Sequence, residues 1–235
     1  MNVAKSLLSS FFDALYPSKC AVCGSVGFAV VCDQCQQELI REELHFIQPI
    51  AHVDEVWAFH AYEQTAAEMV KALKYHRETA LGNRMAGDIL DAYTAYFASV
   101  DFIVPVPIHR SRLAWRGFNQ AAALCSRLPV SMVREGLVRT RRTTPQVHLN
   151  AEDRANNLEG AFEALKIPKG CRVLLVDDVF TTGATASECA RALKQAGARY
   201  VGVACFAAKR RDYPASPASP AYDQPVVDRS EPATQ

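Results

Sequence analysis

The sequence predicts an α/β protein in which a parallel sheet is flanked by helices, with a small cysteine-rich module in front of the sheet. Three observations support this prediction. Apolar, strand-like segments alternate with helix-like segments between residues 54 and 208. The clearest unit, residues 173–208, has the order strand, loop, helix, strand. Near the start of the chain, two C-x2-C pairs are separated by eight residues.

The composition is that of a globular protein. The chain has 235 residues, a formal net charge of +1, 49% hydrophobic and 22% charged residues, which excludes a wholly disordered, collagenous or coiled-coil protein. No apolar run approaches the roughly 20 residues that a membrane-spanning helix needs. The apolar start of the chain is interrupted by Ser9, Ser10 and Asp13, so we interpret it as mature sequence and expect a cytoplasmic protein.

The predicted elements follow one another in a simple order. An amphipathic helix over residues 1–19 precedes the cysteine module, residues 20–48, and a larger domain over 52–210 follows. Within that domain, strands are predicted at 54–63, 101–107, 173–176 and 200–208, and helices at 65–76, 80–98, 118–128 and 184–198. Residues 129–158 are basic and without clear periodicity, which predicts a long loop or a hairpin. Residues 211–235 are rich in proline and are predicted to be disordered.

Four cysteines at the front of the chain have the spacing of a structural zinc site. Each C-x2-C pair can place two thiolates on one metal ion, and two pairs supply the four sulfur ligands of a tetrahedral Zn²⁺ site. All four positions are Cys, so no coordination position remains open for catalysis. Two disulfides or an iron–sulfur cluster are the alternatives. The predicted ligands are Cys20, Cys23, Cys32 and Cys35.

The segment VLLVDDVFTTGAT, residues 173–185, carries the strongest functional signal. It places two adjacent acids, Asp177 and Asp178, after a buried strand and follows them with a loop rich in threonine and glycine at the start of a helix. Backbone N–H groups and hydroxyls of such a loop suit a phosphate group. The acids suit neighbouring hydroxyls of a ribose or a bound metal ion. Simple capping of the loop and helix by these side chains is the alternative.

This segment resembles the phosphoribosyl pyrophosphate (PRPP) motif of type I phosphoribosyltransferases. With the cysteine module and the segments ALKYH, VPVPIHRSRLAWRGFNQA and RTRRTTPQVHLNAEDRANNLEGAF, in this order, the chain is similar to the ComF family. The resemblance implies a type I phosphoribosyltransferase fold that binds PRPP with Mg²⁺. It implies catalytic roles for Asp177 and Asp178, and contacts to PRPP from these acids and from Thr181, Thr182, Gly183, Ala184 and Thr185.

Arginine replaces lysine throughout the middle of the chain. Residues 109–154 contain nine arginines, no lysine and three acids, a bias that suits forked contacts to phosphate. The resemblance implies a pyrophosphate-binding loop at 107–112 and a mobile hood at 139–158. The arginines expected to serve pyrophosphate or the hood are Arg110, Arg112, Arg116, Arg141 and Arg142. An exposed basic turn, or a loop that contacts nucleic acid, is the alternative.

These observations predict a PRPP-binding, phosphoribosyltransferase-like protein whose acceptor the sequence does not identify. The family resemblance links it to natural competence, DNA uptake or the use of external DNA. One alternative is an accessory protein that binds single-stranded DNA and works with proteins of the DNA-uptake machinery. Another is a regulator that senses PRPP without transferase activity.

Overall fold

The computed structural model describes residues 18–27, 30–47, 50–75, 79–141 and 158–209. Almost all of the predicted N-terminal helix, most of the predicted hood with Arg142, and the Pro-rich tail lie outside these residues. Within the described ranges, no helix combines the length and the apolar character needed to cross a membrane.

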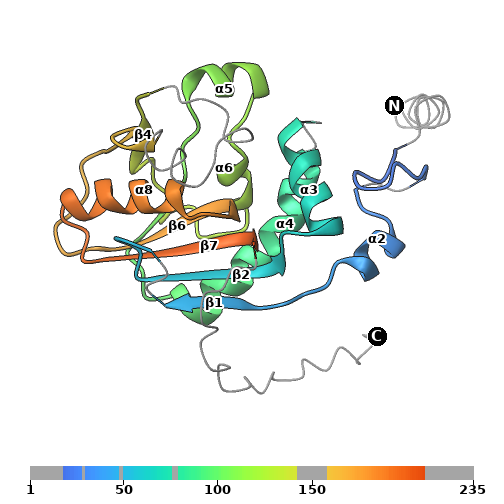
Figure 1. The fold of residues 1–235 in the computed structure, drawn as a ribbon, viewed down its shortest axis with the longest axis horizontal. Helices are drawn as coiled ribbons and strands as arrows, with labels where there is room; N and C mark the ends of the chain where they lie inside the picture. Colours follow the sequence, from blue (N-terminus) through green and yellow to red (C-terminus); the bar gives the residue numbers. More distant parts are fainter. Residues whose placement is uncertain (1–17, 28–29, 48–49, 76–78, 142–157, 210–235) are drawn as a thin grey trace, which may run out of the picture.

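A five-stranded sheet forms the centre of the protein, with the order β1-β2-β7-β6-β3 (Figure 1). Four strands run parallel, which confirms the predicted parallel sheet, and β1 is antiparallel to β2 at one edge. β1 lies in the region assigned to the cysteine module, so that region contributes a strand to the sheet. The strands are β1 Leu44–Ile47, β2 Glu55–Ala61, β3 Phe102–Pro105, β6 Arg172–Phe180 and β7 Tyr200–Ala208.

Helices cover both faces of the sheet. Helix α8, Ala184–Gln195, lies on one face, and helices α3, Gln64–Tyr75, and α4, Thr79–Ala92, lie on the other (Figure 1). Residues of β6 alternate between the two cores, because side chains along a strand point to opposite faces. Val173 and Leu175 belong to the α8 core, and Leu174 and Val176 belong to the α3–α4 core.

The segment after β3 differs from the prediction. One helix was expected at 118–128, but the chain forms two short helices, α5, Arg110–Arg116, and α6, Gln120–Leu124. Gly117 separates them, because its backbone adopts φ 86°, a left-handed conformation that ends α5. Similarly, the helix expected at 80–98 is interrupted after Ala92, where a π-helical segment, Tyr93–Phe97, takes over.

The basic region after α6 returns to the protein as a hairpin-like pair of strands. Strand β4, Leu137–Arg139, pairs in antiparallel fashion with β5, Phe162–Ala164. This pair anchors both ends of the segment predicted to form a hood. It packs on the α8 side of the sheet through Leu137 and Phe162.

The cysteine module is attached to the face covered by α3 and α4. Its helix α2, Asp33–Glu38, carries Gln36, whose side-chain oxygen accepts hydrogen bonds of 2.7 and 3.1 Å from Arg84 of α4. The following segment is fixed by His60 of β2, which contacts the carbonyl oxygen of Ile40 at 2.9 Å and the carboxylate of Asp88 at 3.1 Å.

Candidate functional site

Four parallel strands end at the same edge of the sheet, and the candidate site lies there. In open α/β sheets ligands bind at the carboxyl ends of the strands. Strand β6 is longer than predicted, because its pairing with β7 continues beyond residue 176 to Phe180. Asp177 and Asp178 therefore lie within the strand, and the loop that follows is only residues 181–183.

The loop after β6 turns sharply at Gly183. This residue has φ 76°, and a Cβ atom there would lie 2.5 Å from Ile50 Cδ1 and 2.9 Å from Phe180 Cζ. Both the backbone conformation and the space therefore require glycine. The hydroxyl of Thr182 accepts a hydrogen bond of 3.3 Å from the N–H of Ala184, at the beginning of α8. Ala184 and Thr185, expected in the loop, form the first turn of this helix.

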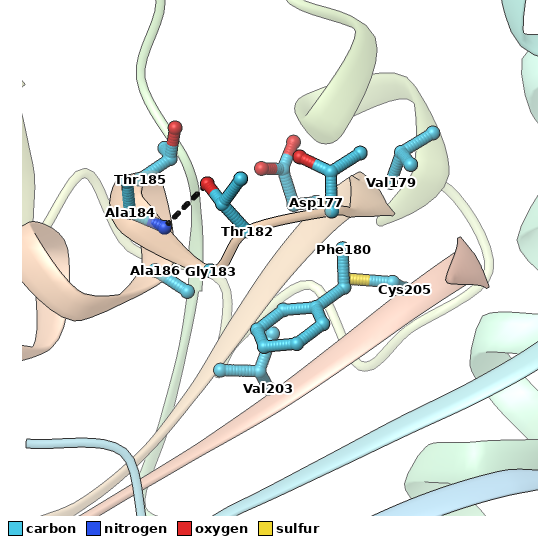
Figure 2. Close-up of a pocket in the computed structure, with 11 residues that line it drawn as sticks. Asp177, Val179, Phe180, Thr182, Gly183, Ala184, Thr185, Ala186, Val203 and Cys205 are labelled. Carbon is cyan, nitrogen blue, oxygen red and sulfur yellow. Dashed lines mark hydrogen bonds between the residues drawn. The ribbon is translucent and has the colours of Figure 1, made fainter. Parts of the chain in front are cut away.

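Figure 2 shows the small pocket around this loop. The carboxylate of Asp177 and the hydroxyl of Thr185 point to the same side of the loop, and the Phe180 ring and Val203 lie beneath it. The apolar floor holds the loop against the sheet. Polar groups are thus presented at the open side, next to the positive end of the α8 dipole.

The two acids have different surroundings. Asp178 is buried, with 3% of its surface exposed, and its Oδ2 lies 2.7 Å from Nζ of Lys74 in α3. Its backbone N–H donates a hydrogen bond of 2.9 Å to Oδ1 of Asp177. Burial and the adjacent Asp178 carboxylate raise the pKa of Asp177 to about 8. Burial opposes the charge of Lys74, but the Asp178 carboxylate outweighs it and raises the pKa of Lys74.

A wider cleft extends from these acids to α3, α5 and β4. Its empty space is about 1270 Å³, including the open mouth. Cationic and aromatic side chains face the acids and the loop across this space. The lining includes Tyr62, Lys74, Tyr75, Arg112, Trp115, Arg116, Gln120, Arg139, Asp177, Asp178, Thr181 and Thr185.

Arg116 is fixed in the wall of this cleft. It is buried, its Nη1 donates a 2.5 Å hydrogen bond to Oε1 of Gln120, and its guanidinium lies 5.8 Å from the centre of the Tyr75 ring. Burial lowers the pKa of Arg116, while the Asp178 carboxylate acts in the opposite direction. Arg139 stacks on Phe162 at 5.2 Å, and burial lowers its pKa as well. Desolvated guanidinium groups of this kind bind anions strongly.

The four front cysteines form a compact cluster that could hold a metal ion. Their sulfur atoms all lie within 4.8 Å of one another. Backbone N–H groups of Cys32 and Cys35 point at the sulfurs of Cys20 and Cys32, at 3.4 and 3.5 Å. Burial alone would raise the pKa of Cys20, but N–H groups around it outweigh burial and lower the pKa to about 6. The cluster thus favours the thiolate form that metal ions bind.

The comparison with known families agrees with this geometry. The sequence profile of the phosphoribosyl transferase domain matches residues 71–222. The protein belongs to this domain family. The phosphoribosyl transferase domain begins within α3, so the match includes Lys74 and strands β3, β6 and β7 and leaves out the cysteine cluster.

Three relatives indicate which phosphoribosyl transferase-domain proteins are similar. DNA utilization protein YhgH of Escherichia coli K12 is 36% identical over 155 residues, which cover 62% of this chain and 68% of the relative. Competence protein F of Haemophilus influenzae is 37% identical over 43% of this chain and 47% of its own length. Competence protein ComFC of Bacillus subtilis is 24% identical over 76% of this chain and 72% of its own length. The predicted resemblance to the ComF family is confirmed.

The structure brings some of the predicted site residues to the cleft and leaves others outside it. Asp177, Asp178, Thr181, Thr185, Arg112 and Arg116 line the cleft, and Thr182, Gly183 and Ala184 line the small pocket beside it. Arg110 is exposed and lies outside both linings. Arg141 is also exposed, and its Nη2 donates a 2.8 Å hydrogen bond to the carbonyl oxygen of Glu159. Arg142 lies outside the described residues.

The sequence assigned no role to several residues of the cleft. Lys74 and Tyr75 stand in the segment ALKYH, which contributed only to the family resemblance. Gln120 was noted only as a polar residue at a helix entrance. A contact such as that between Lys74 and Asp178 joins residues 104 positions apart, and one sequence carries no signal for it.

Proposed function

We propose that the protein binds PRPP together with Mg²⁺ along the carboxyl edge of the sheet and transfers the phosphoribosyl group to an acceptor. The observation that carries this proposal is one cleft in which a threonine–glycine loop, two acids and several arginines face each other. The loop, residues 181–185, suits the 5-phosphate, and Asp177 and Asp178 suit the ribose hydroxyls. Arg112, Arg116 and Arg139 suit the pyrophosphate.

The chemistry expected at this site is a substitution at the ribose C1 atom. The bond between C1 and the pyrophosphate oxygen breaks, and pyrophosphate leaves with the electron pair. A bond from a nucleophilic atom of the acceptor to C1 forms, and the acceptor loses a proton. Bound Mg²⁺ neutralises charge on the departing pyrophosphate. The side chains of the cleft hold the two ends of PRPP and stabilise the charge that develops on the leaving group.

Calorimetry with PRPP and Mg²⁺ tests the binding. The double variant Asp177→Asn/Asp178→Asn should lose most of the affinity, because it removes both carboxylates facing the ribose. A matched control is Glu42→Gln/Glu43→Gln, which also neutralises two adjacent acids but lies outside the cleft lining. Equal affinity in the wild type and the Asp177/Asp178 variant contradicts the assignment.

The transfer step needs a separate experiment. A screen for pyrophosphate release from PRPP over bases, amines and nucleotides would identify the acceptor. Release that depends on one class of acceptor supports the transferase. PRPP binding without release for any acceptor indicates instead a regulator that senses PRPP.

Zinc is our proposal for the metal of the cysteine cluster. Four thiol groups within 4.8 Å of one another match a tetrahedral thiolate site. The backbone N–H groups that point at the sulfurs would orient such ligands. All four ligands come from the protein, so the ion would serve the structure of the module.

Single-stranded DNA is a second candidate ligand, and two exposed aromatic rings favour it. Trp115 and Tyr75 are 58% and 56% exposed, and their rings meet edge to face with centroids 6.3 Å apart. Arg112 and Arg116 lie on the same helix as Trp115. Aromatic rings beside arginines are typical of surfaces that bind single strands, and similar proteins carry the names DNA utilization and competence protein.

One double variant separates the two candidates. If the arginines of the hood hold pyrophosphate, Arg141→Ala/Arg142→Ala should weaken PRPP binding. If they contact DNA phosphates, the same variant should bind PRPP normally. It should then reduce the salt dependence of DNA affinity by roughly 0.7 log unit per lost contact to a single strand. Trp115→Ala should weaken DNA binding in the second case.

A further inference from the structure

Lys74 and Asp178 form a contact that joins the two sides of the cleft. Lys74 lies in the last turn of α3, and Asp178 lies within β6. The distance between Nζ of Lys74 and Oδ2 of Asp178 is 2.7 Å. The Asp178 side chain is 5% exposed and that of Lys74 is 24% exposed, so water screens the pair poorly.

The direction of the Asp178 side chain explains why Lys74 can reach it. Neighbouring side chains of a strand point to opposite faces of the sheet. Asp178 follows the alternation of Leu174 and Val176, which face α3 and α4, whereas Asp177 also lines the pocket of the loop before α8. The two adjacent acids are therefore not equivalent, and Asp178 is the one that faces Lys74.

Asp178 needs a cation in order to stay ionised at this depth. A buried carboxylate without a cationic partner takes up a proton. Lys74 supplies that partner at contact distance, and the raised pKa of Lys74 agrees with a stable ion pair. Arg116 is the next cation whose charge acts on Asp178, but its Nη1 donates to Gln120.

We propose that Lys74 is a positioning residue for the ribose of PRPP: through its ion pair it keeps Asp178 charged and oriented toward the sugar hydroxyls. This inference rests on the proposed function. The amine of Lys74 is engaged by Asp178, whereas Arg112, Arg116 and Arg139 provide the cations for the pyrophosphate. Lys74 therefore acts on the sugar part of the ligand and not on the leaving group.

Three probes distinguish these two roles in calorimetry: PRPP, ribose 5-phosphate and inorganic pyrophosphate, each with Mg²⁺. In the variant Lys74→Met, the affinities for PRPP and ribose 5-phosphate should fall by the same factor, roughly tenfold or more. The affinity for pyrophosphate should stay unchanged. Lys74→Arg should restore most of the lost affinity, because it restores the charge. If Lys74→Met weakens pyrophosphate and PRPP but not ribose 5-phosphate, Lys74 binds the leaving group and the proposal is wrong.

A control on the same helix excludes a general effect of removing a lysine. Lys71 of α3 is exposed and pairs with Glu68 at 2.6 Å. Lys71→Met should bind all three probes like the wild type. A loss in Lys71→Met equal to that in Lys74→Met would show that only the charge of the helix matters, which also contradicts the proposal.

Stability measurements test the ion pair independently of PRPP. Lys74→Met leaves a buried carboxylate without its cation and should lower the melting temperature. Adding Asp178→Asn removes that carboxylate, so the double variant should melt at a higher temperature than Lys74→Met. Additive losses from the two changes would show that the residues are not coupled. If the wild type fails to bind PRPP while this coupling is present, the proposed function fails and the ion pair stands.

Discussion

Arg116 and Gln120 hold each other across the left-handed turn at Gly117. Nη1 of Arg116 donates a 2.5 Å hydrogen bond to Oε1 of Gln120, and each residue is 7% exposed. The last residue of α5 is thereby tied to the first residue of α6. A guanidinium that is already fixed in this way loses little conformational entropy when an anion binds.

Arg116→Gln should therefore weaken the binding of PRPP and of inorganic pyrophosphate by roughly tenfold or more, because it removes a desolvated charge from the cleft. Calorimetry with both ligands measures the loss. The matched control Arg127→Gln removes an exposed arginine that donates to Asn83 outside the cleft. Equal losses in the two variants would mean that Arg116 contributes only to the net charge.

Gly183→Ala should disrupt the loop before α8. The left-handed backbone conformation costs a residue with a Cβ atom about 1–2 kcal/mol, and the overlap with Ile50 and Phe180 adds about 1–3 kcal/mol. Gly170 has nearly the same φ, 75°, with no atom within 4 Å of its Cβ position. Gly170→Ala therefore carries the conformational cost alone. Urea unfolding measures both, and similar losses for the two variants would contradict the packing argument.

The unliganded protein should lose stability as the pH rises from about 4 to about 8. The pKa of Asp177 is raised from 3.8 to about 8 in the folded protein, so within this window the native state holds a proton that the unfolded chain has released. The free energy of unfolding then falls with pH, by at most about 1.4 kcal/mol per pH unit.

Asp177→Asn removes this contribution. The stability of the variant relative to the wild type should grow as the pH rises through the same window, in the absence of Mg²⁺ and PRPP. Denaturant unfolding at several pH values measures the difference, with Asp91→Asn, an exposed acid of α4, as control. A constant difference between Asp177→Asn and the wild type would show that the pKa of Asp177 is not raised.

Elemental analysis of protein produced without added metal should find one zinc ion per chain. Mutation of Cys23 to Ser should release it, because three thiolates hold the ion less tightly than four. Cys125→Ser, which changes a buried cysteine outside the cluster, should retain the metal. Iron in place of zinc, or two disulfides detected by mass, would contradict the assignment.

The central part of the fold was predictable because its elements are long and regular. Residues 173–208 combine two strongly apolar segments with one amphipathic helix, and the structure has β6, α8 and β7 there. Helix α5 was missed because it has only seven residues between a proline-rich strand end and Gly117. Strand β1 was missed because four residues carry little periodicity.

Missing α5 also limited the prediction of the basic wall. Arg112 and Arg116 are four positions apart and share one side of a helix, which faces the cleft. Arg110 is two positions from Arg112, so the helix turns it away. A reading of this segment as a loop gives all three arginines equal status. The role of Lys74 depends on tertiary packing and on the alternation of β6, which local patterns do not encode.

The continuous pairing of β6 with β7 as far as Phe180 divides the cleft into two halves that can evolve separately. On one side, both acids lie on a strand of the central sheet and are joined to α8 by three residues, so their spacing from the loop is inherited with the sheet. On the other side, α5, the end of α3 and the β4–β5 pair are short elements on the periphery. Substitutions there can alter which molecule meets the ribose without disturbing how the sugar phosphate is held. Divergence among relatives in the acceptor they use would then be concentrated in the peripheral half.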